Sequence, residues 1–236
     1  MQFKALHSWD LSPLEAVALQ KQLAGQVALG DDLATPVERV AGVDVSYRRS
    51  GSQFHAAVVV LDYNSMATLE LATASGEVVF PYIPGLLSFR ELPVLLQAMQ
   101  KLAVVPDVIL ADGQGIAHPR RLGLASHLGL WLDLPTIGCA KSRLCGEHGE
   151  PGPNKGDWVP LCEDGMTLGR VVRTKDHVRP LYLSPGHKVG VQSAADLVLH
   201  CCRGYRLPEP TRQAHLLSNR VRQEHEARGE SPETGS

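Results

Sequence analysis

The chain has 236 residues, of which 44% are hydrophobic and 20% charged, so it holds enough apolar material for a buried core. This excludes a wholly disordered or fibrous protein, and the length favours a single domain. The net charge of −2 at pH 7 is unlike that of a strongly basic nucleic-acid coat protein. It is unevenly spread, however: residues 1–117 carry 7 basic and 12 acidic side chains, whereas residues 118–223 carry 15 and 9. The basic second part is compatible with local contacts to phosphates.

The sequence shows neither a membrane span nor a secretion signal. Its longest apolar run, residues 56–61, has the length of a strand, and the N-terminal residues contain no continuous apolar core. The five cysteines are odd in number, two are adjacent, and no C-x-x-C occurs, which argues against a disulfide framework or a zinc site. We therefore expect a cytoplasmic, monomeric protein with reduced thiols and no membrane partner.

The first part of the chain predicts a helix followed by three strands. Ser12 can cap the helix, Pro13 suits its first position and Glu15 completes a capping box, and we expect the helix to reach Gly30. The strand-like runs cover residues 37–47, 54–63 and 66–72, with short polar joins at 49–52 and 64–65. Such joins predict an antiparallel meander.

The second part predicts alternating strands and helices. Helices are expected at residues 88–101, 119–132, 192–203 and 211–226, and strands at 107–111, 135–140, 157–161, 168–173 and 181–183. A meander followed by this alternation predicts an α/β protein with a mixed sheet flanked by helices. We assign residues 1–223 to one domain and expect the acidic segment 224–236 to be disordered.

Three acidic residues occupy positions where an apolar element would not normally carry a charge. Asp44 interrupts one apolar strand, Asp112 ends another just before Gly113, and Glu91 lies in the helix that begins at Ser88. Each has an ordinary explanation by itself: an outward-facing strand residue, an aspartate that starts a turn, and a capping box. Together, converging carboxylates without a matching basic partner suit Mg²⁺ or Mn²⁺, which can activate water in phosphodiester hydrolysis.

His215 lies on a helix that also carries Asn219 and Arg222 on or near the same face. Its imidazole can orient water, move a proton or bind a metal. The alternative is a histidine on the surface of a helix, which has no role in chemistry.

These residues and their surroundings resemble the endonuclease V family, the deoxyinosine 3′ endonucleases. The resemblance covers about residues 9–222 and is carried by Ala41-Gly42-Val43-Asp44-Val45, residues 80–91 with the sequence FPYIPGLLSFRE, Asp112-Gly113-Gln114-Gly115 with His118-Pro119-Arg120, and residues 138–142, 184–187 and 211–219. It implies a ribonuclease H-like fold. The Pro-Tyr-Ile-Pro-Gly segment followed by Phe-Arg-Glu makes the match specific.

The resemblance also implies roles for individual residues. Asp44 and Asp112 correspond to metal ligands, with Glu91 as a third acid that acts directly or through water. His215 and Lys141 complete the catalytic set, with Lys141 near the scissile phosphate. A wedge that separates the DNA strands consists of Pro81, Tyr82, Ile83 and Pro84, and the base pocket and DNA surface include Gly85, Gly113, His118 and His127.

Physical reasoning adds further candidates around the lesion. Hypoxanthine differs from adenine in its O6 and its protonated N1, so backbone N–H groups close to the base can distinguish the two, and glycines permit that approach. We expect this of Gly85, Gly113 and Gly115. Phosphate contacts are expected from basic residues, namely Arg90, Lys141, Arg120 and Arg121.

The implied activity is metal-dependent hydrolysis of the second phosphodiester bond 3′ to a deaminated purine, leaving a 3′-hydroxyl and a 5′-phosphate. Mg²⁺ is the expected cofactor, with Mn²⁺ as a substitute, and DNA containing deoxyinosine is the expected partner. Three alternatives stay open: an endoribonuclease acting on inosine in RNA, a non-catalytic binder of damaged nucleic acid, and a metal-dependent phosphatase. The last does not explain the wedge segment.

Overall fold

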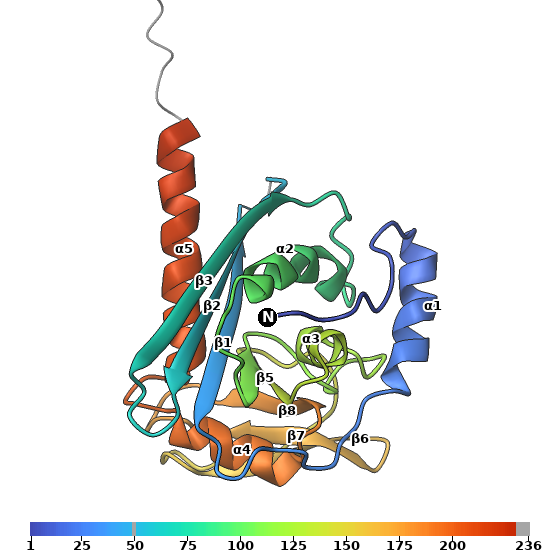
Figure 1. Ribbon diagram of the computed structural model, residues 1–236. Helices are drawn as coiled ribbons and strands as arrows, with labels where there is room; N and C mark the ends of the chain where they lie inside the picture. The colour runs from blue at the N-terminus through green and yellow to red at the C-terminus, as the bar shows by residue number, and fades with distance from the viewer. Residues whose placement is uncertain (49–50, 230–236) are drawn as a thin grey trace, which may run out of the picture.

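The computed structural model describes residues 1–48 and 51–229 (Figure 1). Two predicted segments therefore lie partly outside the described residues: the join at 49–52, through residues 49–50, and the acidic tail, through residues 230–236. Within the described part, no helix is both long enough and apolar enough to cross a membrane.

The described residues form one eight-stranded mixed sheet in the order β3-β2-β1-β4-β5-β8-β7-β6. The strands are β1 Arg39–Tyr47, β2 Gln53–Asp62, β3 Thr68–Glu77, β4 Val108–Ala111, β5 Thr136–Ala140, β6 Trp158–Glu163, β7 Met166–Val172 and β8 Leu181–His187. The first three strands pair antiparallel, which confirms the predicted meander. Strands β4 and β5 continue the sheet parallel to β1, and β8, β7 and β6 follow antiparallel.

Helices cover both faces of this sheet (Figure 1). They are α1 Pro13–Ala24, α2 Ser88–Gln100, α3 Leu124–Leu132, α4 Val191–His200 and α5 Glu209–Gly229. Alternate residues of β1, β2 and β4 enter separate cores: in β1, Ala41 and Val43 pack in the cluster that includes α2 and α3, whereas Val40 packs in the cluster that includes α4 and α5. This alternation is the period of two expected of a strand covered on both faces.

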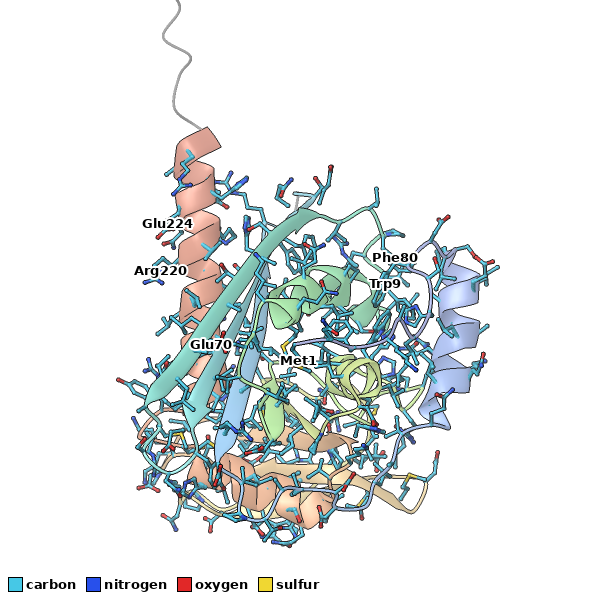
Figure 2. The ribbon with its side chains drawn as sticks, viewed as in Figure 1. Met1, Trp9, Glu70, Phe80, Arg220 and Glu224 are labelled. Carbon is cyan, nitrogen blue, oxygen red and sulfur yellow. The ribbon has the colours of Figure 1, made fainter. Side chains whose placement is uncertain are left out.

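The N-terminal arm crosses the α2–α3 face before α1 begins, with Met1, Phe3 and Leu6 packed against that core (Figure 1). Trp9 and Phe80 then lie close together between α1 and α2, whereas Arg220 and Glu224 point outward from α5 (Figure 2). The predicted capping box of Ser12 and Glu15 is present at the start of α1.

Several predicted boundaries are wrong. Helix α1 ends at Ala24 rather than Gly30, because the following segment pairs with another part of the chain, where the backbone N–H of Lys188 donates to Ala28 O. Strand β3 continues to Glu77 because it pairs with β2 along its whole length. Helix α3 begins at Leu124 rather than 119, since Arg121 adopts the left-handed conformation with φ +59°. Residues 224–229 of the predicted tail are helical.

A close approach between β1 and the start of α5 positions the site. A Cβ added to Gly42 would lie 2.0 Å from the carbonyl carbon and oxygen of Pro210, so only glycine leaves room for that backbone. Asp44, two residues further along β1, faces the same side of the strand as Gly42. Helix α5 therefore runs directly over Asp44.

Candidate active site

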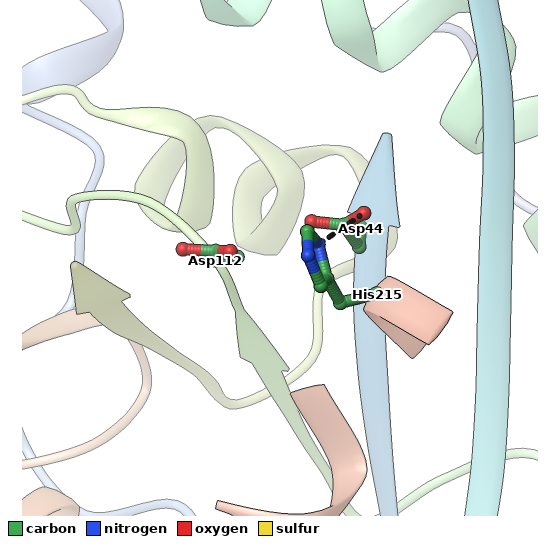
Figure 3. Close-up of side chains that lie close together, drawn as sticks. All are labelled: Asp44, Asp112 and His215. Atoms are coloured by element: carbon green, nitrogen blue, oxygen red, sulfur yellow. Dashed lines mark ion pairs between the residues drawn. The ribbon is translucent and has the colours of Figure 1, made fainter. Parts of the chain in front are cut away.

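Asp44, Asp112 and His215 converge from three elements (Figure 3). Asp44 lies on β1 and Asp112 follows β4, and these strands are parallel neighbours, so the two carboxylates come out at the same edge. His215 reaches them from α5. One ligand atom from each residue lies within 4.8 Å of the other two, which is close enough for all three to hold one metal ion.

Helix α5 also fixes the orientation of Asp44 and His215. The hydroxyl of Ser218 donates to Oδ2 of Asp44, and Nδ2 of Asn219 lies 3.2 Å from Nε2 of the His215 ring. Nδ1 of His215 lies 3.3 Å from Oδ2 of Asp44, an ion-pair distance, although Nδ1 makes no hydrogen bond of acceptable angle. The nearby Asp44 carboxylate raises the pKa of His215. The sequence reasoning missed Ser218, because a serine inside a helix carries no distinctive pattern.

Glu91 lies close to this group without belonging to it. Among the described residues, the set of three mutually close ligands excludes Glu91, so its predicted role as a direct ligand has no support in this geometry. Burial, followed by the charges of Asp44 and Asp112, raises the pKa of Glu91 well above its usual value. A capping box does not explain Glu91 either: the N-cap of α2 is Leu87, and no side chain caps the helix.

The site therefore brings three carboxyl groups together, with Asp44 and Glu91 buried. Burial raises the pKa of Asp112, an effect that its ion pair with the ammonium group of Lys141 opposes. Two carboxylates and an imidazole at these distances fit a divalent cation such as Mg²⁺ or Mn²⁺, since oxygen-rich sites are what these ions prefer.

A cavity of about 380 Å³ adjoins Asp44, Asp112 and His215, which together are called the acidic group below. Its lining includes eight of the residues expected from the sequence, namely Tyr82, Ile83, Pro84, Gly85, Asp112, Gly113, His118 and Lys141. Asp112 thus belongs to both the acidic group and the cavity, and Lys141, which pairs with Asp112, lines the cavity as well. The volume lies within the range of pockets that enclose small ligands. Gln20 and Gln114 also line it, and neither was a candidate in the sequence.

The predicted wedge residues lie on an exposed loop with a buried base. Pro81 is exposed and Tyr82 keeps 63% of its surface accessible, whereas Leu86 and Phe89 pack with Ala16 of α1. The guanidinium of Arg90 lies 5.8 Å from the ring centroid of Tyr82 and 5.1 Å from that of Phe54. Arg90 is therefore half-buried among aromatic rings rather than extended into solvent as a phosphate contact.

His127 and Gly115 do not lie where the sequence reasoning placed them. His127 is fully buried, and Nδ1 and Nε2 of its ring lie 3.0 Å from Ser88 Oγ and 2.8 Å from His7 Nε2. The expected DNA contact of His127 is wrong for this conformation, because the N-terminal arm covers α3. Gly115 is buried beneath the cavity, where a Cβ would lie 2.0 Å from Pro185 O. Gly115 therefore allows its segment to pack closely against the segment of Pro185, and it is not among the residues that line the cavity.

Two further arginines that were expected to contact phosphates bond to other residues of the protein. Arg121 forms an ion pair with Glu163 at 2.6 Å, and Arg120 donates to Gly85 O at 2.8 Å. These contacts compete with their predicted role in binding phosphates. His118, by contrast, lines the cavity as expected, and burial lowers its pKa to about 4.

Comparison with known proteins finds relatives that match most of the chain. Residues 21–216 match the family model described as Endonuclease V. The Endonuclease V of Methanothrix thermoacetophila is 54% identical over 92% of this chain and 96% of its own, and that of Gloeobacter violaceus is 54% identical over 92% and 89%.

Solved structures of Endonuclease V have the same architecture. The Streptomyces avermitilis protein superposes with a TM-score of 0.86 at 43% identity, covering 92% of this chain and 96% of its own. The Ciona intestinalis protein, in complex with a 24mer DNA containing an inosine followed by a ribo-adenosine, superposes with a TM-score of 0.79 at 29% identity, covering 89% and 98%. The fold is ribonuclease H-like, as predicted from the sequence.

Proposed function

The chain belongs to the endonuclease V family, and we propose that it nicks DNA by hydrolysing the second phosphodiester bond 3′ to a deaminated purine. The products are a 3′-hydroxyl and a 5′-phosphate, and the reaction requires Mg²⁺, for which Mn²⁺ substitutes. One observation carries the proposal: Asp112 lines a cavity of about 380 Å³ and is also part of the acidic group with Asp44 and His215. A base held in the cavity thus places its own strand beside the hydrolytic residues. The inosine in the DNA bound by the Ciona intestinalis relative supports hypoxanthine as that base.

Each residue of the acidic group has a role in this reaction. Asp44, Asp112 and His215 would hold the divalent cation, with Glu91 acting through water. The bound cation supplies an electrophile that lowers the pKa of water and stabilises the leaving oxygen. The side chain of Lys141 is 40% exposed while it pairs with Asp112, so its ammonium group can also bind a phosphate oxygen of the substrate.

The cavity and wedge would bring the lesion to these residues. A stacked base must leave the duplex before it can enter the cavity, which costs a few kcal/mol, and less at a mispair. Tyr82 and Ile83 offer apolar surface to replace the lost stacking. Pro81 and Pro84 restrict the backbone of the loop, so that little entropy is lost when the loop enters the duplex.

The Asp44→Ala variant tests the proposal. It should abolish nicking of an inosine-containing duplex in Mg²⁺ while binding of the duplex survives, because the substitution removes a ligand and leaves the cavity intact. Asp10→Ala, at an exposed aspartate far along the chain from the acidic group, is the matched control and should keep wild-type activity. Full activity of Asp44→Ala would contradict the assignment.

One nicking assay separates the alternatives. It compares labelled inosine-containing DNA and RNA, single- and double-stranded, with Mg²⁺, Mn²⁺ or a chelator. Preference for RNA would identify the ribonuclease, since the 2′-hydroxyl distinguishes the two substrates. Tight binding without nicking would identify a non-catalytic binder, and hydrolysis of small phosphate esters a phosphatase.

A further inference from the structure

We propose that Gln20 is a positioning residue that holds the wedge, residues 81–84, in a conformation ready to open the DNA duplex. The inference rests on the proposed function, and it concerns the opening of the duplex rather than the hydrolysis of the strand. Gln20 lies on α1, outside every segment that carries a predicted catalytic or pocket residue.

Gln20 is a polar side chain in an almost completely buried place. Only 1% of its surface is exposed, and it lines the cavity. Its Nε2 donates to Gly85 O at 3.0 Å and to Leu122 O at 2.7 Å, while its Oε1 accepts a hydrogen bond from Nε of Arg120. A buried amide that is satisfied at both ends fixes the groups it touches, because leaving any of them unpaired is costly. Gln20 therefore links α1 to the wedge and to the turn that precedes α3.

The carbonyl of Gly85 is where this network converges. It accepts hydrogen bonds from Nε2 of Gln20, from Nη2 of Arg120 at 2.8 Å and from Nε2 of His118 at 3.0 Å. Nδ1 of His118 accepts the backbone N–H of Arg120 at 3.1 Å, so the neutral ring carries its proton on Nε2 and donates it to Gly85. Three donors from three positions in the sequence thus hold a single peptide group.

The conformation at Gly85 explains why that peptide group needs support. Gly85 has φ +80°, a backbone conformation that side chains other than glycine rarely adopt, and a Cβ there would lie 2.6 Å from Nη2 of Arg120. The residue follows Pro84 directly and begins the turn that leads into α2. The three hydrogen bonds to the Gly85 carbonyl therefore set the direction in which the exposed tip of the wedge, with Tyr82, projects from the protein surface.

This arrangement predicts that Gln20 contributes to the rate of cleavage by an amount that depends on whether the substrate is a duplex. A wedge already held in its working conformation loses less entropy when it enters a duplex. An inosine in a single strand, or within an unpaired bubble, needs no such opening. Gln20 should therefore accelerate cleavage of duplex DNA much more than cleavage of unpaired DNA.

The test uses Gln20→Met, which retains the length of the side chain and removes all of its hydrogen bonds. We measure kcat/KM on inosine in a duplex, in a single strand and in an unpaired bubble. The duplex value should fall about tenfold, the loss expected for the one hydrogen bond of ordinary strength that Gln20 donates to Gly85 O. The other two values should fall less, because they report only the change that the substitution makes in the lining of the cavity, and the ratio of the duplex value to the single-strand value should therefore fall several-fold. Gln22→Met, exposed on the same helix, should match wild type on all three substrates.

The outcomes separate this inference from the proposed function. A wild-type protein that nicks none of the three substrates refutes the proposed function. A wild-type protein that nicks them, with Gln20→Met losing equally on all three or on none, overturns the positioning role of Gln20. If circular dichroism shows that Gln20→Met does not fold, Arg120→Lys replaces it, because it removes the hydrogen bond from Nη2 of Arg120 to the same carbonyl and the one from Nε of Arg120 to Oε1 of Gln20. The same selective loss on the duplex is then expected, and a uniform loss or no loss overturns the role.

Discussion

Gly113 and Gly115 lie two positions apart on one turn and meet different surroundings. Gly113 lines the cavity, and a Cβ there would lie 3.1 Å from the side chain of Leu124, which can move slightly. A Cβ at Gly115 would lie 2.0 Å from the backbone oxygen of Pro185, which cannot move without displacing β8. The first glycine borders the cavity, and the second allows two segments of the chain to pack together.

Alanine at each position should therefore have a different effect. Gly115→Ala should lower the free energy of unfolding by about 3 kcal/mol, as expected for overpacking against backbone, whereas Gly113→Ala should lower it by about 1 kcal/mol. Gly113→Ala should instead change the ratio of inosine to adenosine cleavage, because it narrows the cavity. Urea unfolding and paired nicking assays measure the two effects. Unchanged discrimination would remove Gly113 from the lesion pocket.

Single residues also show what the sequence could reveal about the site. Asp44 and Asp112 were predictable because a carboxylate conflicts with an apolar strand. Gln20 was not, since a glutamine on a helix is unremarkable until the fold buries it. His127 was misplaced because its burial depends on the N-terminal arm, which is distant in sequence and covers it only in the folded chain.

At the level of elements, the contact between β1 and α5 builds the site. Gly42→Ala should push the start of α5 away from β1, since the new Cβ would lie 2.0 Å from the backbone of Pro210. His215 would then lose its position beside Asp44. We expect nicking to be lost and the free energy of unfolding to fall by about 3 kcal/mol. Gly30→Ala is the control, because nothing lies within 4 Å of its added Cβ. Wild-type nicking by Gly42→Ala would show that α5 does not depend on this contact.

The type and order of the elements were largely predictable, and their ends were not. The apolar runs of β1, β2, β4 and β5 identify them as strands in the sequence. The second half of β3, with the sequence TASGE, has little strand propensity and becomes a strand because it pairs with β2. Helix α3 begins late because of the turn at residues 118–123, whose hydrogen bonds involve distant residues such as Gln20. Tertiary contacts of this kind have no local sequence pattern.

For the whole molecule, buried histidines predict how stability depends on pH. Burial lowers the pKa of His118 to about 4 and that of His127 well below 6.5, whereas both titrate near 6.5 in the unfolded chain. The unfolded state therefore binds more protons below pH 6.5, and the free energy of unfolding falls as the pH falls. His118 should remove about 2 kcal/mol between pH 8 and pH 5, and His127 should act in the same direction.

Comparison with a variant isolates this contribution. The raised pKa of Glu91 acts in the opposite direction, since protonation then favours the folded state. We therefore compare wild type with His127→Gln by urea unfolding at pH 8 and pH 5. The variant should lose less stability than wild type over this range, because it lacks the histidine that only the unfolded chain protonates. An equal loss in the two proteins would mean that His127 is protonated in the folded state.

The position of Asp112, shared between the acidic group and the cavity, has a thermodynamic consequence. Two ligands that touch one residue do not bind independently, and their coupling is reciprocal by necessity. If a cation on Asp112 changes the affinity of the cavity for a base, then the base changes the affinity for the cation by the same factor. In this arrangement a base held in the cavity would itself be an effector of metal binding, so the occupancy of the cation site would differ between undamaged DNA and DNA that carries the target base.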